Sequence, residues 1–408
     1  MNCALLSACQ LLLLALVPLA RQQSLEKDIV VVGGGISGLA AARQILNRGG
    51  GNFSVRVYEA RRERYGGRVW TNRLKHPKAR GLEVDLGGSA LNVLNRFANP
   101  LLNLTSDFGL ETVTLGNAAF VVPWQGKRYS GEELTNAMMQ AGNILMEAIN
   151  TTRIKKRDVS VRQAVNQQLK EKGVSDDNLQ TLLLKTLPSY VIEEYSALLY
   201  QPDSLDFGYD QMLLDGMGEL LDRLASGMED ERPLKISLRT AVRQIKVDST
   251  PFWSDDHDVY IVAAERDSER GNLQTWLNLH RVLGKPVLVG MVMDQAGSQI
   301  EALSDEDLRV LVTEKLSSVF GEDVVSAATI TKILRSSWTS DQWSGGSSTY
   351  PRVGNTPDLW DTLAEPLCPY IYFAGEHTTY KGHGSLHGAY LSGLRAADQL
   401  LSGYCEEK

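Results

Sequence analysis

The chain has 408 residues, of which 42 are Lys or Arg and 49 are Asp or Glu, giving a formal net charge of −7 at pH 7. This length allows two or three domains of ordinary size with a substantial core. The 43% hydrophobic and 22% charged residues exclude a disordered or collagen-like chain, and the mild acidity gives no footprint for nucleic acid or an anionic membrane.

The first twenty residues differ from the rest. Residues 4–20 are almost unbroken apolar sequence and are followed at once by Arg21. This pattern is typical of a secretory signal peptide and is short for a membrane span. It predicts that residues 1–20 are removed and that the protein is secreted or lies in the secretory-pathway lumen. Because no Lys or Arg precedes the segment, an uncleaved signal anchor is the alternative.

Two further features bear on that route. Cys368 and Cys405 remain in the mature chain and could form one disulfide, although the sequence leaves their pairing open. Asn52, Asn103 and Asn150 lie in glycosylation sequons, which become acceptors only if the chain enters the secretory pathway.

Residues 28–59 predict a strand, a glycine-rich turn, a helix and a second strand. Asp28–Val32 is a β-branched run, which would be buried on both faces if it is a central parallel strand. Leu39–Leu46 has helix-forming composition, and Ser54–Tyr58 is the second strand.

Later elements are predicted by capping and periodicity. Ser304 with Asp307 forms a capping box before the apolar positions of an amphipathic helix over residues 308–319. Apolar positions between Leu213 and Leu224 predict another helix. Near the end, residues 370–374 predict a strand and residues 388–401 a helix.

The turn after the first strand matches GxGxxG at Gly33, Gly35 and Gly38, with Ser37 inside it. Glycine permits the tight turn and close approach of a pyrophosphate, and the helix N-terminus attracts the phosphates. Glu59 follows Gly38 by 21 residues, where a carboxylate can accept hydrogen bonds from ribose hydroxyls. The strand, turn, helix and acid together predict a dinucleotide-binding α/β unit.

The residues that follow indicate which dinucleotide is bound. Gly66-Gly67-Arg68, in the arginine-rich stretch that begins at Arg61, resembles the second flavin fingerprint of FAD-dependent oxidoreductases. A cationic side chain beside a glycine pair can clamp a pyrophosphate. Leu86-Gly87-Gly88-Ser89 resembles the flavin-contacting turn of the same group.

The C-terminal segments narrow the family. Residues 372–378 and 386–396 closely resemble the ending of flavin-containing amine oxidases, nearest to the branch of polyamine and spermine oxidases and lysine-specific histone demethylases. The block from Trp338 to Asp341 resembles another part of that family. The resemblance implies a doubly wound, Rossmann-like FAD-binding domain of α/β class with an interleaved α+β substrate-binding domain.

The resemblance also implies how the chain is divided and which residues bind the cofactor. It assigns the FAD-binding domain to residues 26–105, 206–265 (truncated) and 336–408, and the substrate domain to residues 106–205 and 266–335. The implied FAD-binding residues are Gly33, Gly35, Ser37, Gly38, Glu59, Arg61, Gly67, Arg68, Leu86, Gly87, Gly88, Ser89, Val242, Trp338, Gly375, Glu376, Leu386 and His387.

The cofactor is expected to be non-covalent, because no cysteine lies between Glu376 and Ser392, where covalent members of the family carry one. His377, His383 and His387 lie close together in the sequence. Gly384 interrupts the stretch and no carboxylate–histidine motif surrounds it, so no metal is predicted.

The sequence departs from the family in its middle. Several tens of residues are missing between about Val262 and Ser268, including the lysine that the family places near flavin N5, so no catalytic residue is assigned. Three wall positions that are often aromatic in the family are Ser348, Ser385 and Ala90 here. The nearby aromatics, which are Tyr350, Trp343 and Tyr380, could either replace them or be packed structural residues.

The resemblance implies an FAD-dependent amine oxidase, polyamine-oxidase-like, that converts a small amine to an imine and aldehyde with O2 and releases H2O2. Two alternatives remain. One is a catalytically impaired flavin-binding paralogue or splice form, and the other an enzyme like an L-amino-acid oxidase, for which no arginine clamp can be placed. No nucleic-acid partner is expected, nor stable membrane association once the leader is cleaved.

Overall fold

The computed structural model describes residues 27–74, 82–93, 99–187, 190–201, 210–228, 231–237, 252–253, 256–284, 286–293, 295–326, 330, 332–368 and 370–405. The expected signal peptide, residues 1–20, and the predicted FAD contact Val242 lie outside these residues. In the described part of the chain, no helix is both long and apolar enough to cross a membrane.

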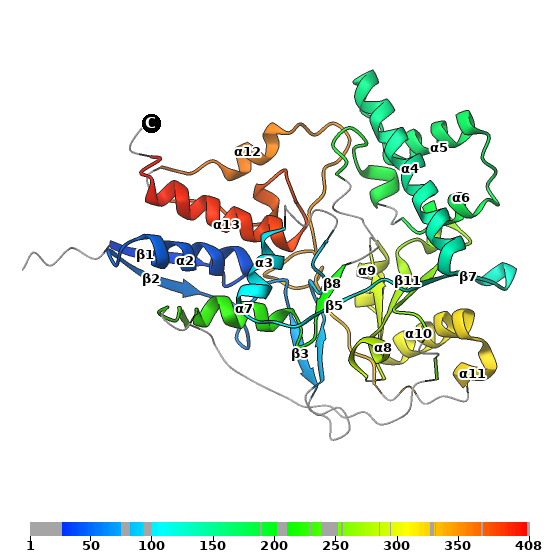
Figure 1. Cartoon of the computed structure of the whole chain (residues 1–408), viewed down its shortest axis with the longest axis horizontal. Coiled ribbons are helices and arrows are strands. Elements are labelled where there is room, and N and C mark those ends of the chain that lie inside the picture. The colour runs from blue at the N-terminus through cyan, green and yellow to red at the C-terminus, as the bar shows by residue number, and fades with distance from the viewer. Residues whose placement is uncertain are drawn as a thin grey trace, which may run out of the picture.

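The first unit is a parallel sheet with helices packed against one face (Figure 1). Its strand order is β1 (Lys27–Val32), β2 (Phe53–Tyr58), β9 (Lys235–Ser237), and β1 pairs with β2 from Lys27↔Phe53 to Val32↔Tyr58. The helices of this unit are α2 (Ile36–Arg48), α3 (Pro100–Asp107), α7 (Met217–Ser226), α12 (Asp358–Ala364) and α13 (Leu386–Leu401). The predicted strand–turn–helix–strand order of residues 28–59 is therefore confirmed.

Helices α2 and α13 lie side by side although they come from opposite ends of the chain (Figure 1). Both present small residues at their contact, and an added Cβ on Gly393 would lie 2.1 Å from the backbone oxygen of Ser37. Leu39 and Ala42 of α2 are fully buried in the core that these helices share. This contact holds the N-terminus of α2 in place.

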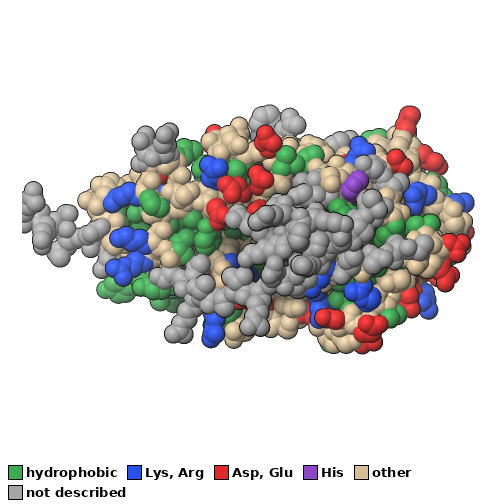
Figure 2. Space-filling view, turned by 90° about the horizontal axis from the view of Figure 1, so that it is seen from below, with side chains coloured by type: hydrophobic (Ala, Val, Ile, Leu, Met, Phe, Trp, Pro, Cys, Tyr) green, Lys and Arg blue, Asp and Glu red, His purple; other side chains and the backbone are tan. Residues whose placement is uncertain are grey.

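The first sheet is covered less completely than the sequence predicts. Among the described strands, β1 lies at the edge of the sheet. Ile29 and Val31 pack against the core, whereas Val30 and Val32 point to the face that the helices leave uncovered and are 59% and 87% exposed. The condition for burial on both faces, a central position in the sheet, is therefore not met in the described part of the chain. Figure 2 shows hydrophobic side chains at the surface among basic ones over this end of the molecule. Residues 370–374, a predicted strand, form only the bridge Leu367↔Ile371.

The second unit is a five-stranded mixed sheet between two helical layers. Its order is β12 (Leu288–Val292), β11 (Asn272–Asn278), β10 (Val259–Val262), β6 (Ala118–Val122), β7 (Lys127–Ser130), with β10 and β6 parallel and the other pairs antiparallel. One core is built with α4 (Gly131–Lys155), α5 (Val161–Lys172) and α6 (Leu179–Leu184), the other with α10 (Asp305–Phe320) and α11 (Glu322–Ser326). The Ser304 hydroxyl accepts from the Asp307 N–H at 3.1 Å, which confirms the predicted cap.

Shorter elements complete the fold. They are the antiparallel pairs β3 (Thr71–Leu74) with β4 (Leu82–Asp85) and β5 (Thr112–Thr114) with β8 (Gln211–Leu213), and the helices α8 (Leu279–Leu283) and α9 (Gln295–Glu301). Leu213, expected in the helix before Leu224, therefore ends a strand, and the helix itself begins at Met217.

The expected domain division needs one correction. Residues 206–265 were assigned to the FAD-binding domain, but Val259–Val262 forms β10 and pairs with β6 in the second sheet. Local sequence could not distinguish these partners, because an apolar β-branched strand of four residues suits either buried sheet. The chain therefore passes from the first unit to the second between Ser237 and Val259.

The expected position of the missing segment lies in a short, well-bonded connection. Between β10 and β11 the chain is continuous and tightly bonded, and the Gln274 amide donates to the Val262 carbonyl at 3.0 Å while accepting from the Gly271 N–H at 2.7 Å. The two strands are direct antiparallel neighbours. An insertion between Val262 and Ser268 would therefore interrupt this connection.

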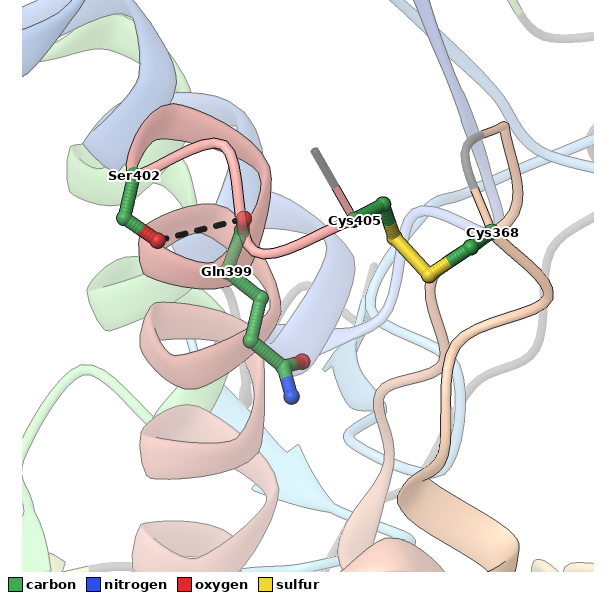
Figure 3. Close-up of a disulfide and its surroundings, with 4 residues drawn as sticks. All are labelled: Cys368, Gln399, Ser402 and Cys405. Atoms are coloured by element: carbon green, nitrogen blue, oxygen red, sulfur yellow. Dashed lines mark hydrogen bonds between the residues drawn. A yellow bond between two sulfur atoms is a disulfide. The ribbon is translucent and has the colours of Figure 1, made fainter. Parts of the chain in front are cut away.

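Cys368 and Cys405 form a disulfide, with their Cα atoms 5.3 Å apart (Figure 3). The bond joins the loop after α12 to the turn that follows α13. It closes a loop with a sequence separation of 37, and it resolves the pairing that the sequence left open.

Replacement of Cys368 by serine should destabilise the chain by about 2–4 kcal/mol, because a covalent loop restricts the unfolded state. Urea denaturation of the oxidised protein and the variant would measure the difference. Reduced wild-type protein is the matched control and should unfold at the same urea concentration as the variant. Alkylation of both Cys368 and Cys405 in native wild-type protein would contradict the bond.

Candidate functional site

The glycine-rich turn joins β1 to α2 in the geometry of an anion site. Gly33 adopts a φ of 101° and donates to the Tyr58 carbonyl at 2.8 Å. Gly35 is the N-cap of α2, no side chain caps the helix, and its first turn carries no acid. The first N–H groups of the helix therefore remain available to a negatively charged ligand.

Glu59 lies at the end of β2, directly beside this turn. Its carboxylate accepts from the Gly34 N–H at 2.9 Å and from the Arg61 N–H at 2.8 Å, and its side chain is 4% exposed. Arg61 instead reaches the later block, donating to Asp341 at 2.8 Å and to the Ser344 hydroxyl at 2.7 Å. Glu59 and Arg61 thus fix the turn from behind.

The second fingerprint forms the next part of the wall. Arg64, which the sequence analysis did not single out, donates to the carbonyls of Gly67 and Val69 at 2.8 and 3.0 Å. Burial lowers its pKa to about 10, and its guanidinium lies 5.1 Å from the Trp70 ring centroid. Arg64 therefore shapes the loop, which leaves Arg68 as the cation of this loop that lines the cavity.

Glu376 is the buried anion opposite Arg68. It accepts from Arg68 at 2.7 Å, from the Thr349 hydroxyl at 2.5 Å and from the Gly384 N–H at 2.8 Å. Burial opposes its charge, but the positive charge of Arg68 and these hydrogen bonds outweigh it and hold the pKa of Glu376 below its usual value. Glu376 is thus an ionised anchor, which orients Arg68 and the turn at Gly384.

The loop of residues 86–89 completes the rim. An added Cβ on Gly87 would lie 2.0 Å from the Arg68 carbonyl oxygen, and one on Gly88 would lie 2.9 Å from Leu386. Both glycines are therefore required by close packing. Trp338 closes the rim by donating its indole N–H to the Leu86 carbonyl at 3.1 Å.

These elements enclose one cavity of about 1720 Å³. Of the predicted cofactor residues, it is lined by Gly35, Ser37, Gly67, Arg68, Leu86, Gly87, Gly88, Ser89, Trp338, Gly375, Glu376 and Leu386. Gly33, Gly38, Glu59, Arg61 and His387 support the site without lining it. The cavity continues along β12 and α10 into an apolar chamber, where Phe252, Trp253 and Trp276 also line the wall.

The structure shows where the three aromatic residues lie that could replace the missing wall aromatics. Tyr350 donates to Glu194 at 2.6 Å and stacks on Tyr195, Tyr380 packs against Trp360, and Trp343 is 56% exposed. None of the three proposed substitutes lines the cavity. The aromatic residues that do line its chamber come from segments the sequence analysis did not connect with the site.

A flavin dinucleotide fits the residues present. A Cβ added to Gly35 would find only Gly67 Cα, at 3.9 Å, so open space lies where a pyrophosphate would approach the turn. The α2 N-terminus and Arg68 supply positive potential there. The cavity exceeds the roughly 300–1,000 Å³ of ordinary ligand pockets, so it has room for a cofactor and a substrate. In the part of the chain described, no group of three or more His, Cys, Asp or Glu residues could hold a metal.

Comparison with known proteins identifies the family. The sequence profile described as "Flavin containing amine oxidoreductase" matches residues 36–267 and 248–401. The chain belongs to the flavin-containing amine oxidoreductases. The fold is also that of a putrescine oxidase bound to putrescine. That structure superposes on this chain with a TM-score of 0.66 at 20% sequence identity. The superposition covers 93% of this chain and 99% of the putrescine oxidase chain.

Curated relatives lie in the two expected branches. The chain is 26% identical to lysine-specific histone demethylase 1 homolog 2 of Arabidopsis thaliana, over 94% of this chain and 60% of that protein. It is 27% identical to polyamine oxidase 4 of Oryza sativa subsp. japonica, over 95% of this chain and 91% of that protein. The chain thus spans well under two thirds of the demethylase homolog but most of the polyamine oxidase.

The alignments also show that relatives carry additional residues. The alignment with polyamine oxidase 4 runs over 458 positions, whereas this whole chain has 408 residues, so at least 50 positions of that relative have no counterpart here. Polyamine oxidase 4 therefore carries positions that this chain lacks, which agrees with the missing segment that the sequence predicts.

Proposed function

We propose that this flavin amine oxidoreductase oxidises the C–N bond of a small amine, with FAD as a non-covalent cofactor and O2 as electron acceptor. The amine loses two electrons and two protons to give an imine, water hydrolyses the imine to an aldehyde and a shorter amine, and O2 is reduced to H2O2. The observation that carries this proposal is the single cavity that joins the glycine turn to an apolar chamber.

The residues of the chain would serve binding and orientation. Gly35, Ser37 and Arg68 would hold the pyrophosphate, and Glu376 would keep Arg68 in place. The N-terminus of α13, which lines the cavity at Leu386, would place its positive dipole end beside the flavin. The bound flavin supplies the redox chemistry, and the apolar chamber excludes water from it.

Polyamines are the first substrates to test. Relatives named polyamine oxidase and a structural neighbour named putrescine oxidase support this choice. A second candidate is a catalytically impaired flavin-binding paralogue or splice form. It is supported by the 50 or more unmatched positions and by the absence of the expected lysine.

We also propose that the protein follows the secretory pathway. The apolar segment of residues 4–20 and the Cys368–Cys405 disulfide support this route, because such bonds persist in oxidising compartments. Asn52, Asn103 and Asn150 are all exposed and accessible to glycosylation. A size shift on glycosidase treatment of protein from secreting cells would test the proposal.

Purified protein should be yellow and should release FAD on denaturation, because the cavity is shaped for a dinucleotide and no described cysteine is free to attach one. The visible absorbance spectrum would be recorded first, because bound oxidised flavin colours the protein yellow. Peroxide release would then be followed with a panel of polyamines and monoamines. A folded, colourless protein that takes up no FAD would contradict cofactor binding, and a yellow protein inert on the whole panel would favour the impaired form.

A further inference from the structure

His383 is buried where the two units of the chain meet. It is 2% exposed. Its ring centroid lies 5.5 Å from that of Trp360 and 6.1 Å from that of Tyr195. Its Nε2 lies 2.6 Å from the Tyr195 hydroxyl oxygen, and its Nδ1 lies 2.8 Å from the Tyr380 carbonyl oxygen. The side chain therefore has a polar partner at each ring nitrogen.

These partners determine the tautomer of the ring. A carbonyl oxygen can only accept, so Nδ1 of His383 must carry the hydrogen that is donated to Tyr380. In a neutral ring Nε2 is then an acceptor, and the Tyr195 hydroxyl donates to it. Burial lowers the pKa of His383 below its usual value, so the ring is neutral at pH 7.5 and the Tyr195–His383 hydrogen bond has one direction.

Tyr195 belongs to the helical core of the second unit. It is 2% exposed, packs in the core that includes α4 and α5, and its carbonyl accepts from the Val161 N–H at the start of α5 at 3.2 Å. Its hydroxyl points out of that core to His383. The bond thus crosses from the substrate-side helices to the C-terminal segment of the first unit.

On the other side, His383 adjoins the cavity wall. The next residue, Gly384, donates its N–H to Glu376, which holds Arg68. Ser385 then caps α13 by accepting from the Gly388 N–H at 3.0 Å. Gly384 and Ser385 both line the cavity. A displacement of His383 would therefore move the N–H groups and the helix start that face the proposed flavin.

We propose that His383 is a positioning residue, which uses its hydrogen bond from Tyr195 to hold the Gly384–Leu386 turn at the flavin site in register with the substrate-side helices. The inference rests on the proposed flavin binding. It predicts that a hydroxyl buried in the second unit, outside the cavity lining, influences how the first unit holds its cofactor.

The test is a set of variants compared at pH 7.5 for FAD affinity and for the shape of the flavin absorption bands. Tyr195→Phe removes only the hydroxyl and leaves Nε2 of His383 buried without its donor, so FAD should dissociate about tenfold more readily, with altered band structure. His383→Gln places an amide donor and a carbonyl acceptor at this position and should therefore retain much of the wild-type FAD affinity. His383→Phe should resemble Tyr195→Phe, and the double variant should be no worse than His383→Phe alone.

Two controls separate positioning from general stability. Tyr129→Phe removes a hydroxyl from a half-buried tyrosine that packs on the same core, and His377→Gln changes an exposed histidine of the same C-terminal segment. Both should bind FAD like wild type. Thermal melts of all variants would show which remain folded.

The outcomes separate the two proposals. If wild type is yellow and folded Tyr195→Phe keeps wild-type FAD affinity and spectrum, the positioning role is wrong and the proposed function stands. The same holds if Tyr195→Phe lowers only the melting temperature. If wild type itself binds no FAD, the proposed function fails and the positioning role fails with it.

Discussion

Gly35→Ala should leave the protein folded but weaken FAD binding at least tenfold, equivalent to about 1.4 kcal/mol or more. The backbone of Gly35 has φ −73° and ψ 173°, which any residue can adopt. The new methyl group would meet no atom closer than 3.9 Å in the chain. It would, however, project where the turn must approach the pyrophosphate. The variant therefore tests the space available to the pyrophosphate without disturbing the fold.

Gly38→Ala is the matched contrast. The Cβ of the new alanine would lie 2.1 Å from the Gly33 carbonyl oxygen. No rotamer change relieves this clash, because the oxygen belongs to the backbone. We expect a loss of about 3 kcal/mol or more in the free energy of unfolding. Circular dichroism melts and FAD titration by fluorescence quenching would measure both variants. Wild-type FAD affinity in folded Gly35→Ala would show that the pyrophosphate does not lie at this turn.

The chain with its missing segment restored should oxidise spermine or N-acetylated polyamines at least about a hundredfold faster than the chain as it stands, a difference of about 2.7 kcal/mol in the barrier. In the described part of the present chain β1 is an edge strand with Val30 and Val32 exposed, and the sequence predicts that the family's lysine near flavin N5 lies in the missing segment. The segment supplies that polar group and additional residues around the units.

The structure favours one place for the insertion. We would insert the segment between β9 and β10, after Ser237 and before Val259, because an insertion between β10 and β11 would interrupt their direct pairing. The corresponding residues of a polyamine oxidase would be used, and peroxide release measured at matched flavin content. Insertion between Val262 and Ser268 is the control and should disrupt the second sheet. Equal turnover by the restored and present chains would show that the segment is dispensable.

Local sequence signals predicted elements of both units. Gly33, Gly35 and Gly38 define a turn by steric requirements that act within a few residues, and Ser304 caps α10 through an N–H three residues away. Predicted cofactor residues from both ends of the chain lie around one cavity. This could be predicted because the family resemblance supplied long-range information, which the spacing of residues lacks.

Strand partners were predicted less well. Val259–Val262 was assigned to the wrong sheet, because its apolar residues suit either one and only pairing with β6 decides between them. Residues 370–374 have strand-forming composition but lack a ladder partner beyond a single bridge. Arg64 was overlooked for a similar reason, since its role depends on carbonyls that become its neighbours only when the loop closes.

The contact of α2 with α13 also constrains when the protein can fold in the cell. α2 emerges from the ribosome early, but the helix that packs against it, at Ser37 and Gly393, is synthesised more than 300 residues later (386 − 48 = 338). At about 5–20 residues per second, the nascent chain would wait on the order of tens of seconds for this partner. The cofactor site is thus completed only after α13 has emerged from the ribosome, and a chain truncated before Leu386 would not retain FAD.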